Sequence, residues 1–135
     1  MPSYRLREAA DLLGVSDDTV RRWAESGRLA TETDAAGRRV VEGAVLARFA
    51  EAHATAVPEV GTVSRESARN RFVGLVTRVV RDNVMAQVEL QCGPYRVVSL
   101  MSREAADDLG LAPGVRAIAS VKSTNVVVEV SSTDR

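Results

Sequence analysis

The chain has 135 residues, enough for one domain or for two small ones. Its 18 basic and 18 acidic side chains cancel at pH 7, so a single copy has no strong overall attraction for nucleic acid or for an anionic membrane. Any contact with DNA therefore needs locally placed arginines and several copies of the chain.

The scarcity of reactive side chains argues against catalysis. His53 is the only histidine and Cys92 the only cysteine, so one chain can form neither a disulfide nor a cysteine-based zinc site. No convergent pair of carboxylates suggests acid–base chemistry, and we expect no enzyme. The sequence shows no signal peptide and no apolar run of spanning length, which favours a cytoplasmic location without membrane contact.

Two short helices are predicted near the N-terminus. The first can be capped by Ser3 and ended by Gly14, and the second can be capped by Ser16 and ended by Gly27. Two short helices joined by a turn of a few residues are typical of a helix-turn-helix. The first helix has apolar residues at the i, i+3, i+4, i+7 spacing of an amphipathic helix: Leu6, Ala9, Ala10 and Leu13.

The second helix carries side chains that suit contact with DNA. Thr19 and Arg22 lie one turn apart with Arg21 beside them, and arginine is the commonest side chain at both phosphates and base edges. In the alternative interpretation these arginines form a solvated face, because acidic side chains stand within one turn of them: Asp17, Asp18 and Glu25.

A hairpin and a third helix are predicted next. Short extended runs at 29–33 and 38–41 flank a turn that contains Gly37, a pattern typical of a hairpin. Arg38 and Arg39 at its tip would suit contact with phosphate or with the minor groove. A third helix should begin at Glu42 or Gly43 and pack onto the first two.

Four segments carry a family resemblance: Tyr4–Ala10, Leu13–Ser16, Thr19–Trp23 and Gly27–Leu29. With them, residues 3–52 resemble the winged helix-turn-helix domain of the MerR and excisionase superfamily, although the wing keeps only Gly37-Arg38-Arg39 of the family pattern. The resemblance implies that residues 1–52 bind double-stranded DNA as a dimer. The candidate contacts are Ser16, Thr19, Arg21, Arg22, Arg38 and Arg39.

Residues 53–65 are predicted to be a linker. They mix Ala, Thr, Pro58, Gly61 and Ser64 without periodicity, which favours a tether between two units. Pro58 argues against one long helix through this stretch.

The second half is predicted to be mostly β-structure. Alternating apolar and polar residues, rich in valine and separated by turn residues, indicate strands, and Ser102 can cap a short inserted helix at 103–109. The expected strands are 72–81, 84–90, 95–100, 115–121 and 125–130. Five strands with one helix predict a small OB-like β-barrel over residues 66–131 and make the whole chain an α+β protein.

Three segments of this half carry a second resemblance: Ser67-Ala68-Arg69-Asn70 with Phe72 and Gly74, Leu109-Gly110-Leu111 with Gly114, and Val121–Thr124 with Val126. They resemble the molybdate-binding Mop, or TOBE, domain of the molbindins. The resemblance implies that a molybdate or tungstate dianion is the ligand, held where subunits meet, with no organic cofactor. The implied site residues are Ser67, Arg69, Asn70, Ser102, Ala105, Lys122 and Ser123, with Ala105 offering only its backbone N–H.

The chemistry of these residues suits such a ligand. A dianion taken out of water needs compensating charge and hydrogen-bond donors. Lys122, the only lysine of the chain, is a compact point charge, and Arg69 presents a rigid fork of donors. In the alternative interpretation the same residues are ordinary polar surface, with Ser102 only capping its helix and Arg69 pairing with Glu66.

The two resemblances together predict a transcriptional regulator that senses molybdate or tungstate and binds DNA. They imply a homo-oligomer, either a hexamer or a dimer. The alternative is a molbindin-type protein that stores or buffers molybdate, in which the helical part only assists assembly.

Overall fold

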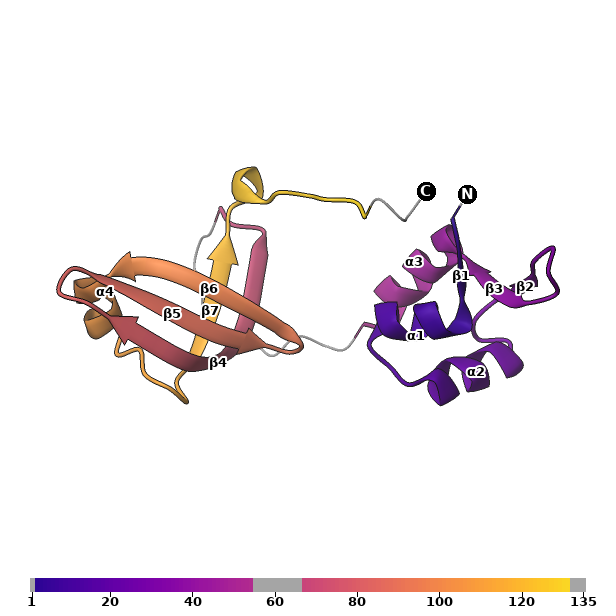
Figure 1. Cartoon of the computed structure of the whole chain (residues 1–135), viewed down its shortest axis with the longest axis horizontal. Helices are drawn as coiled ribbons and strands as arrows, with labels where there is room; N and C mark the ends of the chain where they lie inside the picture. The colour runs from indigo at the N-terminus through magenta and orange to yellow at the C-terminus, as the bar shows by residue number, and fades with distance from the viewer. Residues whose placement is uncertain (1, 55–66, 132–135) are drawn as a thin grey trace. The chain divides into compact units, whose positions relative to one another are not determined.

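The computed structural model describes residues 2–54 and 67–131 of the 135-residue chain. The chain divides into two compact units, a helical head in its first part and a β-domain in its second (Figure 1). No helix among the described residues is long and apolar enough to cross a membrane. The predicted linker 53–65 lies almost wholly outside the described residues.

The head combines three helices with a small antiparallel sheet whose strand order is β1-β3-β2. The hairpin of β2 and β3 pairs Thr33 with Arg39, as predicted for the wing. Its elements are β1 (Ser3–Arg5), α1 (Leu6–Leu13), α2 (Asp17–Glu25), β2 (Glu32–Thr33), β3 (Arg39–Glu42) and α3 (Gly43–Ala52).

Local signals set most helix ends of the head. Gly14 ends α1 with a φ of 70°, a left-handed conformation that favours glycine. Ser16 caps α2, because its Oγ accepts the backbone N–H of Thr19 at 3.2 Å. The prediction that Ser3 caps the first helix is wrong. Ser3 instead begins strand β1 and pairs with Glu42, and α1 starts only after Arg5.

The three helices enclose a small core with the wing strands. Val20 of α2, Val41 of β3 and Phe49 of α3 are all buried there, and Leu29 is 1% exposed between α2 and the wing. Trp23 packs its ring against Phe49 at a centroid distance of 5.0 Å, and Phe49 stacks on His53 at 3.9 Å. The core thereby fixes α2 relative to the wing.

The β-domain is a curled antiparallel half-barrel of four strands in the order β6-β5-β4-β7, with α4 at one end. Ser102 caps α4 as predicted, since its Oγ accepts the N–H of Ala105 at 3.1 Å. The elements are β4 (Asn70–Arg81), β5 (Met85–Cys92), β6 (Tyr95–Ser102), α4 (Arg103–Asp108), β7 (Arg116–Val121) and a 3₁₀ turn (Ser123–Asn125).

The curl depends on Gly74, where the long strand β4 changes partner. Leu75 is the last residue that β4 pairs with β5, through Gln91, whereas Gly74 pairs with Ala117 of β7. A β-carbon at position 74 would lie 2.4 Å from the carbonyl oxygen of Gln91 and 2.6 Å from Sγ of Cys92. Only glycine lets the two strands cross this closely.

The predicted last strand is absent. The stretch predicted as strand 125–130 begins in the 3₁₀ turn, and residues 126–131 then form no regular secondary structure. β7 pairs only with β4 among the described strands. The valine pattern is that of a strand, but a strand needs a partner edge, and this segment meets none among the described residues.

Candidate functional site

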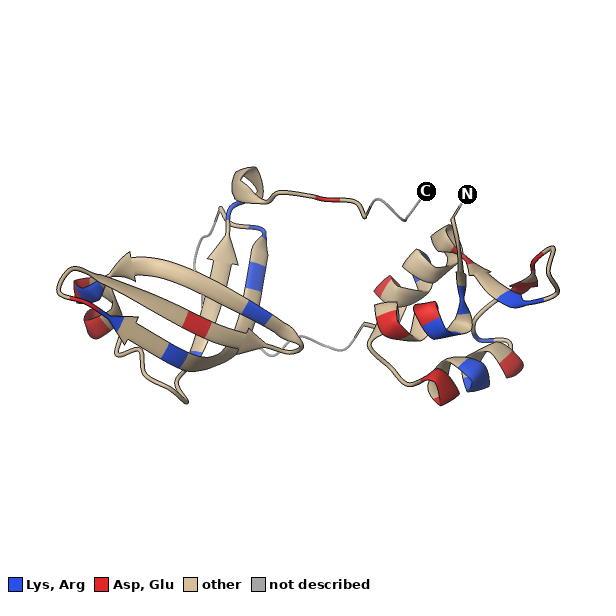
Figure 2. Ribbon diagram, viewed as in Figure 1, with Lys and Arg blue, Asp and Glu red and all other residues tan. Residues whose placement is uncertain are grey.

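The head contains a hollow of about 400 Å³ between the start of α1, the start of α2 and the wing. Five arginines line it, together with the side chains of Leu6 and Asp17. The head as a whole is not uniformly basic, because acidic and basic segments alternate along its helices (Figure 2). The hollow gathers arginines that are dispersed in the sequence: Arg5, Arg7, Arg21, Arg38 and Arg39.

The wing is held in shape by Asp34. Its Oδ1 accepts the backbone N–H groups of Arg38 and Ala36, both at 2.9 Å, and its Oδ2 lies 3.4 Å from Nε of Arg38. The N–H of Arg38 is the main cause that holds the pKa of Asp34 below its ordinary value of 3.8. Arg39 is positioned separately, by donating from Nη2 to Oγ1 of Thr31 at 3.1 Å.

The exposed face of α2 carries a chain of short polar contacts. Oγ of Ser16 lies 2.9 Å from Oγ1 of Thr19, which accepts from Nη2 of Arg22 at 3.4 Å. The alternative of a paired, solvated face is seen only at Arg21, whose Nη1 lies 4.0 Å from Oδ1 of Asp18, with both side chains mostly exposed. A surface pair of this kind contributes little, so Arg21 can exchange it for another anion.

The structure brings together only part of the DNA-contact set predicted from the sequence. Arg21, Arg38 and Arg39 share the hollow, whereas the polar contacts of Ser16, Thr19 and Arg22 lie along α2 outside its lining.

Sequence reasoning missed Arg5 and Arg7. They enter the hollow because β1 pairs with β3 through Arg5 and Val40, next to the wing. Both arginines belong to the family segment Tyr4–Ala10, but only the strand register places them beside the wing.

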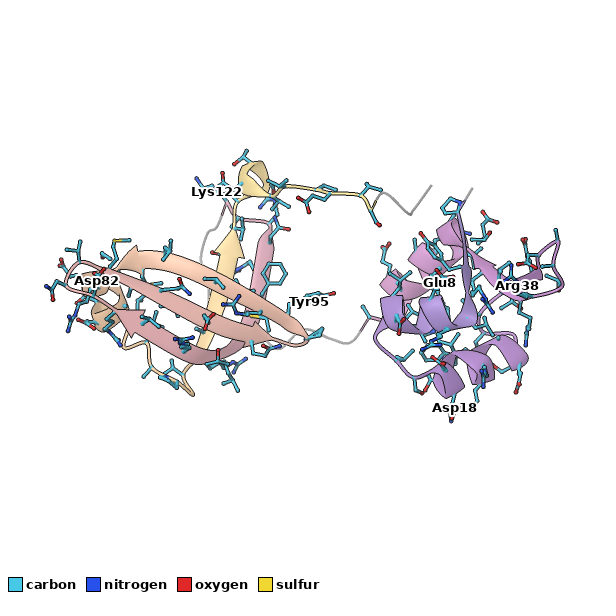
Figure 3. All side chains as sticks on the ribbon, in the orientation of Figure 1. Glu8, Asp18, Arg38, Asp82, Tyr95 and Lys122 are labelled. Carbon is cyan, nitrogen blue, oxygen red and sulfur yellow. The ribbon has the colours of Figure 1, made fainter. Side chains whose placement is uncertain are left out.

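In the β-domain, five of the seven predicted oxyanion residues gather where β4 begins and β7 ends. Asn70 pairs with Val121, and its Nδ2 donates to the Val121 carbonyl at 3.3 Å. Arg69 directly precedes Asn70 in the chain, and Lys122 directly follows Val121 at the end of β7 (Figure 3). Ser67 precedes this strand end and Ser123 follows it; we call these five residues the ladder end.

The two cations of the ladder end have no acidic partner in the part of the chain that is described. Neither Arg69 nor Lys122 makes an ion pair there, and both are exposed. By contrast, Arg81 and Arg96 on the same sheet pair with Asp107 and Glu89. Exposed cations with hydroxyl and amide donors beside them are the kinds of group that bind small oxyanions.

The remaining two predicted residues, Ser102 and Ala105, lie at the opposite end of the sheet. Ser102 pairs with Met85 and opens α4, which is joined to the far end of β4 through Arg81 and Asp107. The N–H of Ala105 is already donated to Oγ of Ser102. One chain therefore does not bring Ser102 and Ala105 to the ladder end.

Comparison with family models identifies two domains in this order. A helix-turn-helix domain model matches residues 3–54, and a TOBE domain model matches residues 66–128. Two curated relatives each match just under half of this chain. Molybdenum-pterin-binding protein 3 of Clostridium pasteurianum is 38% identical over 63 residues, which are 46% of this chain and 93% of that protein. Molybdenum-pterin-binding protein 2 of the same organism is 35% identical over 63 residues, which are again 46% of this chain and 93% of that protein.

Solved structures also match the β-domain. A molybdate-binding protein from Sporomusa ovata is 29% identical, with 49% of this chain and 98% of that one covered and a TM-score of 0.48. MopII from Clostridium pasteurianum is 33% identical, and the match covers 49% of this chain and 100% of that one, with a TM-score of 0.46. The cytoplasmic molybdate-binding protein ModG, solved with molybdate bound, is 38% identical over 47% of this chain and 45% of that one, with a TM-score of 0.45.

Proposed function

Because this chain belongs to the TOBE family through a Mop-like domain and also carries a helix-turn-helix domain, we propose that it is a DNA-binding regulator that senses molybdate or tungstate. The observation that carries the proposal is the presence in one chain of two separate anion-facing surfaces. One is the arginine-lined hollow of the head, and the other is the ladder end of the β-domain.

The head surface suits the DNA backbone. Arginines at a hollow between a recognition helix and a wing can contact phosphates on either side of a groove, while Thr19 and Arg22 on the exposed face of α2 can reach base edges. Since the chain has no net charge, its affinity for DNA depends on this local cluster and on several heads acting together. The assignment of the head to the MerR and excisionase type stays a prediction.

The ladder end suits one half of a molybdate cage. Lys122 supplies a point charge, Arg69 a fork of donors, and Ser67, Asn70 and Ser123 directional hydrogen bonds. A dianion needs donors on most sides before its desolvation is offset, and one chain offers them on one side only. We infer that a second copy supplies the remaining groups, with Ser102 and the N–H of Ala105 as the candidates. Ligand bound between copies can then bias DNA affinity by favouring one arrangement of the heads.

Calorimetric titration of molybdate tests the ladder end. Lys122→Ala should weaken binding by about 10-fold or more, because it removes a charged hydrogen-bond donor. The matched control is Arg78→Ala, which removes an exposed cation from the middle of β4. Equal affinities of Lys122→Ala and wild type would remove Lys122 from the site. Parallel titrations with tungstate and sulfate establish which oxyanion is preferred.

Fluorescence anisotropy of labelled DNA from the region upstream of the gene for this chain measures the DNA affinity of the head. Arg7→Ala should lower the affinity for every sequence and reduce the slope of log affinity against log salt by about one. Arg48→Ala is the matched control, since Arg48 is exposed on α3 outside the hollow. An Arg7→Ala protein with the wild-type slope would contradict the phosphate role of the hollow.

The alternative of molybdate storage is separated by the same DNA experiment. The Clostridium pasteurianum relatives extend over little more than the β-domain, which is the observation that keeps this alternative open. A storage protein would bind molybdate and leave the anisotropy of the DNA unchanged at every protein concentration. A regulator would bind the DNA and change its affinity when molybdate is added.

A further inference from the structure

Among the described residues, one acidic side chain lines the arginine-lined hollow of the head. It belongs to Asp17, the first residue of α2, which shares the hollow with Leu6 and the five arginines. A carboxylate repels phosphates, so an acid at this point would weaken a surface that only gripped the DNA backbone. The position of Asp17 therefore indicates a role other than phosphate binding.

Three neighbouring acidic side chains have partners close to them in the chain. Glu8 accepts the backbone N–H of Arg5 at 3.0 Å at the start of α1, and Asp34 holds the turn of the wing. Asp18 lies 4.0 Å from Nη1 of Arg21, and its side chain is 88% exposed on the outer side of α2 (Figure 3). Helix capping, turn formation and a surface ion pair thus account for these three carboxylates.

Asp17 makes no ion pair with any described residue, although arginines line the same hollow. Arg21 stands four residues further along α2, the usual spacing of a helical ion pair, yet the structure pairs it with Asp18. Asp18 also lies in the first turn of α2, so a favourable interaction with the helix dipole is available without Asp17. The half-buried Asp17 carboxylate thus keeps its acceptor lone pairs for a group from outside the chain.

The end of α2 that carries Asp17 is the end that reads bases in a helix-turn-helix. A recognition helix lies in the major groove with its N-terminal residues at the base edges. Asp17 opens α2, and Thr19 and Arg22 follow it along the helix. Contacts of the hollow's arginines with phosphates at the rim of the groove would then place the carboxylate next to the base edges.

An ionised carboxylate accepts hydrogen bonds and donates none, so it discriminates between bases. Cytosine presents its 4-amino group in the major groove as a donor, whereas thymine presents the O4 acceptor and guanine presents the acceptors O6 and N7. Adenine has an amino donor, but the N7 acceptor lies beside it. A carboxylate in the groove therefore favours cytosine and is repelled by thymine at the same position.

We propose that Asp17 is a specificity-determining residue of the head, which accepts a hydrogen bond from the 4-amino group of a cytosine in the major groove and rejects thymine there. The proposal rests on the DNA-binding role of the head. At a site with this cytosine, the hydrogen bond compensates for the repulsion between Asp17 and the phosphates, and at other sequences the repulsion remains. The arginines thus supply affinity for any DNA, and the acid makes that affinity depend on sequence.

Selection from a library of random-sequence duplexes tests the proposal with two matched variants. Asp17→Asn keeps the size of the side chain, but its amide has both donors and an acceptor and so tolerates thymine as well as cytosine. Asp18→Asn is the control, since it removes the adjacent acid, which lies outside the lining of the hollow. Wild type and Asp18→Asn should select the same cytosine, and Asp17→Asn should lose that preference while it keeps the rest of the site. Identical preferences of wild type and Asp17→Asn at every position would overturn the proposal.

Fluorescence anisotropy on the selected site, and on the same site with thymine in place of the cytosine, measures the size of the effect. Thymine should weaken binding of wild type by about 10-fold and binding of Asp17→Asn by less than about 2-fold. On a duplex of unrelated sequence, Asp17→Asn should bind up to about 5-fold more tightly than wild type, because a negative charge near the phosphates is removed. An equal loss with thymine in both proteins would contradict the reading of cytosine by Asp17.

The failure of this inference is distinguishable from the failure of the proposed function. A wild type that binds library DNA but selects no cytosine overturns only the role of Asp17. A wild type that retains no DNA from the library overturns the DNA-binding role of the head, and the role of Asp17 with it. Melting followed by Trp23 fluorescence should give the same midpoint for Asp17→Asn and Asp18→Asn, because each removes one acid from the first turn of α2.

Discussion

Gly74→Ala tests whether the crossing of β4 over β5 shapes the β-domain. The added carbon would lie 2.4 Å from the Gln91 carbonyl oxygen and 2.6 Å from Sγ of Cys92. Ordinary carbon contacts begin near 3.5 Å, so the strands would have to part by roughly 1 Å. The nearest obstacle is backbone, which cannot rotate away as a flexible side chain could.

Overpacking of this kind typically costs 1–3 kcal/mol, and the backbone contact places Gly74→Ala at the upper end, about 3 kcal/mol. In a domain of this size each kcal/mol lowers the melting temperature by about 4–8 °C, so the β-domain should melt about 12–24 °C lower. Because β4 also carries Asn70 of the ladder end, molybdate binding should weaken in parallel.

Two probes separate the effect on each unit. Fluorescence of Trp23, the only tryptophan, follows the head and should show an unchanged midpoint. Far-UV circular dichroism follows both units, so a transition that Trp23 fluorescence does not share reports the β-domain. Val73→Ala is the matched control, since Val73 is the neighbouring residue on the opposite face of β4 and should cost less than about 1 kcal/mol. A Gly74→Ala β-domain that melts within about 4 °C of wild type would refute the close crossing.

Three further outcomes are expected in the head. Ser16→Ala should destabilise it by about 1 kcal/mol through loss of the helix cap, and an unchanged Trp23 fluorescence midpoint in urea would contradict that role. Phe49→Ala removes the ring that packs 5.0 Å from Trp23 and should cost about 3–5 kcal/mol, with the β-domain transition unmoved. The backbone N–H of Arg38 lowers the pKa of Asp34 below 3.8. The stabilisation of the wing by the ionised Asp34 carboxylate is therefore present above pH 3.8 and is lost as the pH falls through the folded pKa. A midpoint at or above 3.8 in an NMR titration of Asp34 would disprove this.

The sequence alone determined the features that depend on near neighbours in the chain. Gly14 ends α1 in a left-handed conformation and Ser16 caps α2 because these ends need only one backbone torsion or one hydrogen bond within four residues. The hairpin of the wing, the start of α3 at Gly43 and the cap of α4 by Ser102 are local in the same sense. Family motifs added the helix-turn-helix and the Mop-like domain.

Only the tertiary structure decided the features that depend on register between distant segments. The pairing of Asn70 with Val121 joins residues 51 positions apart and creates the ladder end. The pairing of Arg5 with Val40 brings Arg5 and its neighbour Arg7 to the wing, where no local pattern predicted them.

The valine-rich segment after β7 shows the limit of local patterns most directly. Its alternation predicts a strand, but a strand exists only where a partner edge supplies its hydrogen bonds, and the 3₁₀ turn at Ser123–Asn125 leads it away from every edge of its own chain that is described. The alternation of side chains in the sequence indicates which conformation a segment favours. Pairing is settled by the whole fold, which offers this segment no partner edge among the described strands.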